Sequence, residues 1–165
     1  MQDRYLQSGG ESVNEVGKID QYIRFLIAGA VRGYIVDKMG KETTTVFITN
    51  PGGVIAGSRM LDGSASEIGF RVIRDSEIFS IPIDTVLKLQ AQYQEIIELY
   101  MMMPAQAASY HWETKKMLYL KSARERYEWF LKHYPELIDS VNHYDIASFL
   151  NITPVTLSRI RRDVK

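Results

Sequence analysis

The pattern of apolar and polar positions along the chain changes character near residue 82. Before it, short runs rich in Ile, Val, Tyr and Phe alternate with polar turns that contain Gly, Pro, Asn or Asp. Residues 22–36 and 43–48 are two such runs, and the turn DKMGKE at 37–42 separates them, which predicts a β-hairpin. Two further runs, at 66–73 and 76–82, predict two more short strands. Short strands with frequent turns favour a β-sandwich or barrel.

After Pro82 the pattern becomes helical. Residues 84–133 contain no glycine and one proline, Pro104, which should kink a helix. Apolar side chains recur at alternating spacings of four and three, which predicts a heptad-like seam. The seam consists of Ile96, Tyr100, Met103, Ala107, Tyr110, Thr114 and Met117. We expect a dimerisation helix here, with packing of the same stripe on the β domain as the alternative.

A second helix is predicted from Ser122 to Tyr134, with Ser122 as its cap and Pro135 as its end. The closing stretch, DIASFLNITPVTLSRIRRDVK (145–165), then predicts two short helices joined by a turn at Asn151, which tolerates left-handed backbone. Ala147 must be small because the second helix crosses over it. With this register the positions that must face inward are all apolar: Ile146, Ala147, Leu150, Ile152, Leu157 and Ile160.

The second of these helices has the chemistry of a DNA reader. Thr153 is placed to cap it and Pro154 occupies its first turn. The residues left on its outer side are Val155, Thr156, Ser158, Arg159 and Arg162. Near the helix start, Val155, Ser158 and Arg159 would reach base edges in a major groove. Thr153 and Thr156 would bind phosphate instead. A purely structural helical hairpin is the alternative, but it would seldom satisfy every position.

Composition narrows the class of protein. The chain has 165 residues, 45% hydrophobic and 24% charged, which suits one ordinary domain or two small ones with a packed core. It contains no cysteine, which excludes disulfides, thiolate metal sites and cysteine nucleophiles. No apolar run reaches the ~18–20 residues of a membrane span, and the start lacks the features of a signal peptide. We therefore expect a cytoplasmic protein with no membrane partner.

Charge is uneven along the chain although the total is zero. Residues 1–112 hold ten basic and thirteen acidic side chains, net −3, whereas residues 113–165 hold ten and seven, net +3. A basic end on a neutral body fits a DNA-binding end, and it also fits a solvated terminal helix. The three histidines lack metal-ligand spacing, and no phosphate-binding or nucleophile motif is present. We expect neither an enzyme nor a metal site.

Two segments of the sequence resemble parts of the Crp/Fnr family of bacterial transcription regulators. They are RYEWFLKHYPELIDSVNHYDIASFLNITPVTLSRIRRDV (126–164) and KIDQYIRFLIAGAVRGYIVDKMGKETT (18–44). The resemblance covers essentially the whole chain. It implies an α+β fold with an N-terminal double-stranded β-helix (jelly roll), a long dimerisation helix and a C-terminal helix-turn-helix (winged-helix-like) domain. The expected domains are residues 1–82, 83–118 and 119–165.

The resemblance also implies partners and a site. The expected partners are double-stranded DNA, a second copy of the chain and, as a further candidate, RNA polymerase. The recognition helix would be Thr153–Asp163. A small effector would bind in the β-roll, where the stretch matching the family's cyclic-nucleotide cassette is Asn50–Phe70. The candidate pocket residues are Gly53, Ile55, Gly57, Ser58, Arg59, Ser66 and Arg71.

Three departures from the family pattern qualify these expectations. From the resemblance we expect the sequence to begin inside the β-roll, after the position of the family's leading helix. The cassette has no acid before Asp62, and Ser66–Glu67 stand where its arginine belongs, so a cyclic nucleotide is not expected and the effector is unidentified. Val155 replaces a common glutamate, and the sequence stops at Lys165, just after the recognition helix, where many family members carry a β wing. The lack of cysteine rules out the cysteine-ligated iron–sulfur branch, and haem is not expected.

The sequence therefore predicts a dimeric DNA-binding transcription regulator. The alternative is a degenerate β-roll sensor or protein-interaction module that dimerises without regulating DNA.

Overall fold

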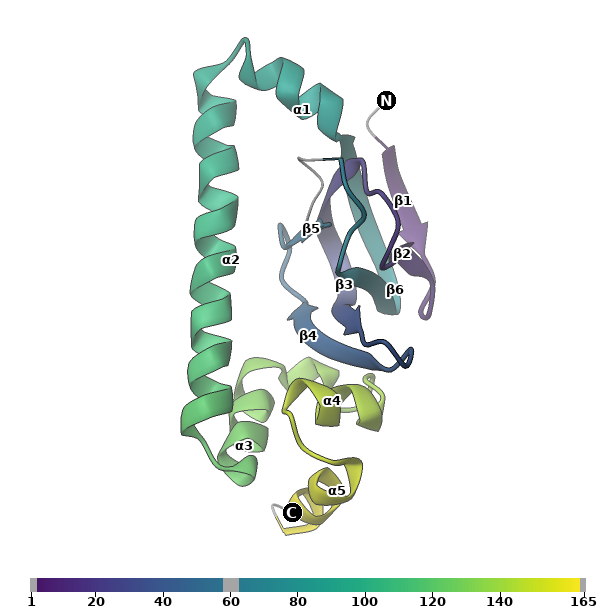
Figure 1. Cartoon of the computed structure of the whole chain (residues 1–165), viewed down its shortest axis with the longest axis vertical. Helices are drawn as coiled ribbons and strands as arrows, with labels where there is room; N and C mark the ends of the chain where they lie inside the picture. Colours follow the sequence, from purple (N-terminus) through teal and green to yellow (C-terminus); the bar gives the residue numbers. More distant parts are fainter. Residues whose placement is uncertain (1–2, 58–62, 164–165) are drawn as a thin grey trace. The chain divides into compact units, whose positions relative to one another are not determined.

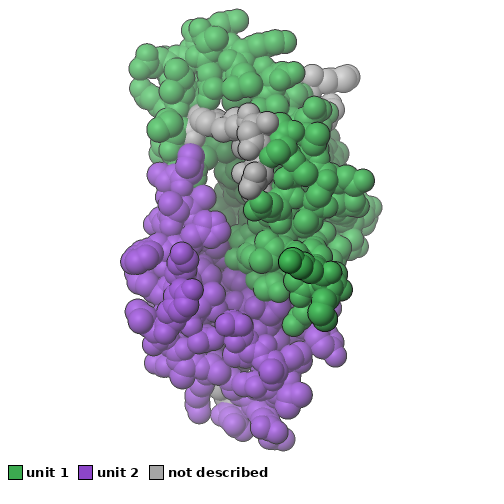
Figure 2. Space-filling model, in the orientation of Figure 1, with its two compact units in different colours: residues 1–103 green, residues 104–165 purple. Residues whose placement is uncertain are grey.

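The computed structural model describes residues 3–57 and 63–163, with the side chains of Asp3 and Tyr100 left out. These residues form two compact units, 1–103 and 104–165, which are coloured separately in Figure 2. The boundary falls inside a long helix, so the division differs from the three-part division expected from the sequence.

Unit 1 contains a β-roll. In the described part of the chain, six antiparallel strands form one sheet in the order β1-β6-β3-β4, with β2 paired to β6 and β5 paired to β3. Figure 1 shows β3 and β6 side by side within it. The strands are β1 (Asp3–Gln7), β2 (Ser12–Asn14), β3 (Tyr22–Val36), β4 (Glu42–Ile48), β5 (Val54–Ala56) and β6 (Gly69–Pro82).

The expected hairpin at 22–48 is confirmed as β3 and β4. Asp37 organises its turn, because its Oδ1 accepts hydrogen bonds from the amides of Met39 and Lys41 at 2.8 and 3.0 Å. The expectation of two strands at 66–73 and 76–82 was wrong, because β6 runs without a break through the polar residues between them.

A bulge in β3 curves the sheet into a roll and lets the two parts of this strand pair with different neighbours, β5 and β4. The β3–β6 register shifts between Leu26 and Val31. At the centre of this shift Gly29 has φ 108°, and a Cβ there would come within 2.6 Å of the Ser76 Cα. The hydroxyl of Ser76 accepts the Ala30 amide at 3.0 Å and so satisfies a donor that the bulge displaces. The first part of β3 then pairs with β5, and its last part pairs with β4.

The interior of the roll is apolar. Alternate residues of the strands face it, and those that form its core are Leu26, Val31, Ile48, Ile55, Phe70, Val72 and Ile78. A second, smaller cluster joins Ile23 to Ile83 and Val86 of α1 (Ile83–Gln90), which follows β6 directly.

The long helix expected at 83–118 is two helices. α1 ends at Gln90, and α2 (Gln94–Leu120) starts after a turn at 91–93. The turn sequence contains neither glycine nor proline, so nothing local signals it. α2 then continues through Pro104 as one helix.

Unit 2 is helical apart from its connections. Its elements after α2 are α3 (Ala123–His133), the short 3-10 helix η1 (Pro135–Leu137), α4 (His143–Phe149) and α5 (Pro154–Asp163). Ser122 caps α3 as expected, in a reciprocal box with Glu125. The core of this unit includes rings of Phe130, Tyr134 and Phe149, whose centroids lie 5.6 to 6.2 Å apart.

Candidate nucleic-acid interface

The turn between α4 and α5 is built as the sequence predicts. Asn151 has φ 50° and is the one non-glycine residue with positive φ among the described residues. This conformation reverses the chain, and the Ile152 amide then donates to the Ala147 carbonyl at 3.0 Å. Asn142 begins the pair of helices by accepting the Tyr144 amide at 2.7 Å on its Oδ1.

The predicted inward face is confirmed. Ile146 and Ala147 are 1% exposed, and Leu150 and Leu157 are fully buried. Ile152 and Ile160 are half-buried at the edges of this contact. The two helices therefore cross on a small apolar contact with a methyl group at its centre.

The start of α5 is capped by Thr153. Its Oγ1 accepts the Thr156 amide at 3.1 Å and lies 2.8 Å from the Thr156 hydroxyl. Pro154 is the first helical residue, where no amide hydrogen is needed. Both predictions for this end are confirmed. The bond between the two threonine hydroxyls uses one of their two protons, so the other proton remains available to donate to a phosphate.

The outer face of α5 is solvent-exposed. Val155 is 61% exposed, and Ser158, Arg159 and Arg162 are also exposed. Their spacings of three, one and three residues place them on one side of the helix. The face opposite Leu157 therefore presents one apolar, one hydroxyl and two guanidinium groups in a row.

Arg161 does not belong to that face. Its Nη1 donates to His143 Nδ1 at 3.4 Å, and His143 Nε2 lies 3.1 Å from the Pro154 carbonyl. A carbonyl only accepts, so Nε2 carries the proton and Nδ1 is the acceptor. His143 thus ties the start of α4 to the first turn of α5.

Sequence reasoning also missed Arg126 of α3. Its Nη1 donates to the carbonyls of Leu150 and Asn151 at 3.1 and 3.4 Å, and its Nε donates to the Lys121 carbonyl at 2.9 Å. The end of a helix leaves carbonyls without partners. From the sequence one can therefore expect that the carbonyls at the end of α4 require hydrogen-bond donors. Nothing in the local sequence shows which arginine supplies them.

The seam expected to form a dimer faces its own chain at several positions. Met103 packs on the Ile23 cluster of unit 1, and Met117 is 1% exposed. The Tyr134 hydroxyl donates to the Tyr110 hydroxyl at 2.9 Å, and burial together with that neighbour raises the pKa of Tyr134. Thr114 is buried, Ile96 is half-buried and Ala107 is exposed. The side chain of Tyr100 lies outside the described residues.

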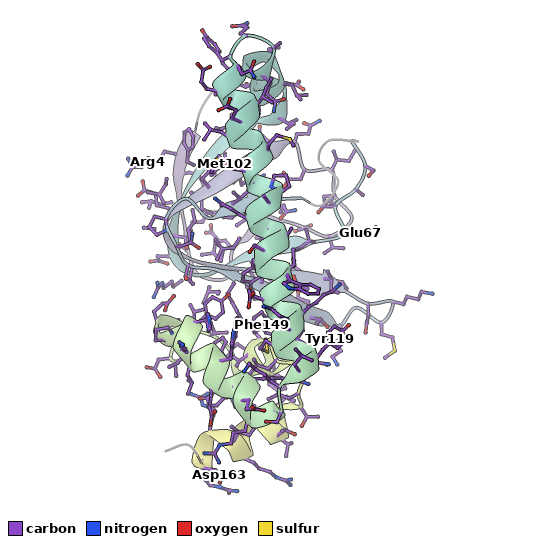
Figure 3. All side chains as sticks on the ribbon, turned by 90° about the vertical axis from the view of Figure 1, so that its left-hand side faces the viewer. Arg4, Glu67, Met102, Tyr119, Phe149 and Asp163 are labelled. Atoms are coloured by element: carbon purple, nitrogen blue, oxygen red, sulfur yellow. The ribbon has the colours of Figure 1, made fainter. Side chains whose placement is uncertain are left out.

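A different side of α2 is apolar and exposed. We call it the exposed stripe; it consists of Ile97, Met101, Ala105, Ala108, Trp112 and Tyr119. Met101, Trp112 and Tyr119 are 65, 63 and 79% exposed. Tyr119 is labelled near the end of α2 in Figure 3. Spacings of four, four, three, four and seven residues keep these side chains on one side of the helix.

The predicted effector residues of unit 1 are only partly brought together. Ile55 is a core residue, and the space beside Gly53 is filled, since a Cβ there would lie 2.3 Å from the Ile48 side chain. The Gly57 amide donates to Asp20 Oδ2 at 3.2 Å, and Ser66 donates to the Ile68 carbonyl at 2.8 Å. Ser58 and Arg59 lie outside the described residues.

Arg71 points away from the roll interior. It lies between Phe70 and Val72, which both face inward, and it donates to the Glu42 carboxylate at 2.9 and 3.0 Å. Burial tends to raise the pKa of Glu42, but hydrogen bonds from Arg71 and Arg32 outweigh it and the pKa is lowered. Arg71 therefore cannot supply the positive charge of an interior pocket.

The described residues contain no group of three or more His, Cys, Asp or Glu side chains arranged to hold a metal ion. None of the helices within the same residues is long and apolar enough to cross a membrane.

Comparison with known proteins gives matches among solved structures only. No protein-family model and no curated protein sequence matches the chain. FixK2 from Bradyrhizobium japonicum superposes with a TM-score of 0.83 at 19% identity, over 99% of this chain and 84% of that one. A transcriptional regulator of the CRP/FNR family from Thermus thermophilus gives 0.79 at 15% identity, over 98% and 85%.

A third match is CLP, a c-di-GMP responsive global regulator from Xanthomonas campestris. It superposes with a TM-score of 0.80 at 12% identity, over 99% of this chain and 86% of that one. Identities this low establish similarity of fold. The fold class expected from the sequence is therefore confirmed, and the chain has the fold of the Crp/Fnr transcription regulators.

Proposed function

We propose that this chain is a DNA-binding transcription regulator that acts as a dimer. The observation that carries the proposal is the outer face of α5, where Val155, Ser158, Arg159 and Arg162 lie together toward solvent while Leu157 opposite them is buried. Two of the proteins that share its fold are described as regulators, which supports the same role here.

In this proposal α5 enters the major groove of DNA. Arg159 lies near the middle of the helix and is the candidate reader of guanine, through a bidentate contact with O6 and N7. Arg162, one turn later, would contact phosphate together with the Thr153 hydroxyl. Arg161 would contact neither, because its guanidinium donates to His143.

The dimer would form through the exposed stripe of α2. In water, a row of apolar side chains along a 27-residue helix is stabilised when a second copy covers it. Because the predicted seam is largely occupied within the chain, the exposed stripe replaces it as the proposed contact. A symmetric dimer would present two α5 helices to half-sites about one turn apart, ~34 Å.

A small effector bound in unit 1 would control the dimer. Such a molecule changes DNA affinity only if it binds two arrangements of the dimer with different affinity.

Selection from a random duplex library with the full chain tests the function. We expect an enriched two-fold symmetric sequence, and binding that weakens as salt rises because phosphate contacts release counterions. A chain that sediments as a dimer but enriches no sequence and shows no salt dependence would instead be a dimerising interaction module, and the regulator proposal would be discarded.

A further inference from the structure

The interior face of β3 carries a charged side chain that the proposed function does not use. Arg24 is 8% exposed and lies two residues before Leu26, on the same face of the strand, so it points into the β-roll. Its register partners are Ser80 of β6 and the fully buried Ile55 of β5. A buried guanidinium is stable only when its charge and its donors are matched.

The charge of Arg24 is matched by Asp20. The Arg24 Nη1 donates to both carboxylate oxygens, at 2.8 and 2.9 Å, and lies 3.5 Å from the Tyr22 carbonyl. Asp20 is 5% exposed and also accepts amides of Tyr22 and Gly57, at 3.3 and 3.2 Å. The acid therefore has a full set of donors, and the pair is neutral.

The donors of Arg24 are only half used. All the hydrogen bonds that it makes to described residues come from Nη1, which leaves the Nε–Nη2 edge without a partner among them. The side-chain nitrogen and oxygen atoms that are both buried and unpaired in the described residues are Gln7 Oε1 and Asn14 Oδ1. Neither Nε nor Nη2 of Arg24 is among these atoms, so the unpaired edge is not completely buried.

Two hydroxyl groups lie on the same face. Ser80 donates to the Tyr5 hydroxyl at 3.0 Å, and the proton of Tyr5 has no acceptor among the described residues. Tyr22, two residues before Arg24 on this face, is 41% exposed, and its ring centroid lies 5.2 Å from the guanidinium carbon. This end of β3 thus combines unused donors with an aromatic ring that reaches solvent.

We propose that the Nε–Nη2 edge of Arg24 and the Tyr5 hydroxyl bind a small organic monocarboxylate. A carboxylate matches the two parallel N–H groups of this edge, as it does in bidentate arginine pairs. A phosphate dianion would place a second negative charge beside Asp20, so it is disfavoured. The Tyr22 ring would cover the organic part of the ligand. This site names the ligand class for the proposed effector control and in that respect depends on it.

Binding can be tested without DNA, so failure here is distinguishable from failure of the proposed regulator. The full chain labelled with 15N would be titrated with acetate, propionate and benzoate, and separately with acetamide, propionamide, benzamide and inorganic phosphate. We expect the Arg24 Nε–H signal to shift saturably with the carboxylates and to stay in place with the amides. A signal that ignores all three carboxylates, or follows the amides equally, would overturn the proposal.

Variants separate the ligand contact from the ion pair. We expect benzoate to raise the melting temperature of the unmodified chain. Arg24→Lys retains a cation for Asp20 but lacks the planar edge, so this rise should disappear in the variant. Tyr5→Phe should weaken benzoate binding about tenfold, as loss of a hydrogen bond to a charged group does. Arg4→Lys is the matched control, because Arg4 is an exposed arginine paired with Glu77. Retention of benzoate binding by Arg24→Lys would refute the assignment.

Discussion

α5 and α2 both have two distinct faces, yet the sequence identified the faces of one and not of the other. For α5, the cap at Thr153, the turn at Asn151 and the small Ala147 each fix the rotation of the helix independently. For α2, only a periodic pattern was available, and two apolar stripes satisfy it. Periodicity tells which side chains lie together, whereas capping and turn chemistry tell which side faces the protein.

The strongest test of this contrast removes a side chain from the inner face of α5. Leu157→Ala should lower the free energy of unfolding by about 2–5 kcal/mol, because it empties a fully buried site. Urea unfolding of the full chain measures the change. Val155→Ala, on the exposed face, should stay within about 0.5 kcal/mol. Equal losses for the two variants would mean that α5 has no distinct outer face.

The next test concerns the exposed stripe of α2. Trp112→Ala should weaken self-association by about 2 kcal/mol or more, since a large aromatic side chain at the centre of an interface contributes strongly. Sedimentation velocity across a concentration series measures it. Gln106→Ala, on another side of the same helix, should leave the dimer unchanged, whereas Met117→Ala should lower thermal stability only. If Met117→Ala dissociates the dimer and Trp112→Ala does not, the predicted seam is the interface after all.

A smaller effect is expected on DNA affinity from the outer face of α5. Arg159→Ala should cost about 1–3 kcal/mol on the selected sequence and should relax preference at one base pair. Fluorescence anisotropy with the selected duplex and single-base variants measures both. Arg161→Ala is the paired control, because Arg161 contacts His143 in the chain. An equal loss on every duplex would reassign Arg159 to phosphate contact.

The smallest effect tests the turn itself. Asn151→Ala should destabilise the chain by about 1–2 kcal/mol, because a left-handed backbone strains a residue with a Cβ. Asn151→Gly should be tolerated at little cost, since glycine adopts this conformation freely. Thermal unfolding measures the stability of both variants. Equal stability of the two would show that the turn relaxes to another conformation.

The β-roll could be predicted as a class but not in its connections. The polar residues at 74–75 indicated a gap between two strands, yet β6 passes through them because Ser76 hydrogen-bonds the bulge opposite Gly29. That contact joins residues 46 positions apart, and no local pattern reveals it. The same limit explains Arg71, since alternation with Phe70 and Val72 sends it to the outer face, where Glu42 takes its charge.

Arg24 illustrates a different limit. In the sequence it is one polar residue inside an apolar strand, which an exposed position explains equally well. Only the register with Ser80 and Ile55 shows that it faces the interior, and only the geometry of Asp20 shows which nitrogen is used. A charged residue four positions after an acid is common on any surface, so the pair carries no signal of its own.

Separation of the two faces of α5 has an evolutionary consequence. Val155, Ser158, Arg159 and Arg162 lie outside the buried contact between α4 and α5, whereas the turn, the cap and Arg126 hold the helix in place. If α5 reads DNA as proposed, mutations at the four outer positions change which operator is read without loss of folding. Duplicated copies of such a gene could acquire new target sites by a few substitutions while keeping the same scaffold.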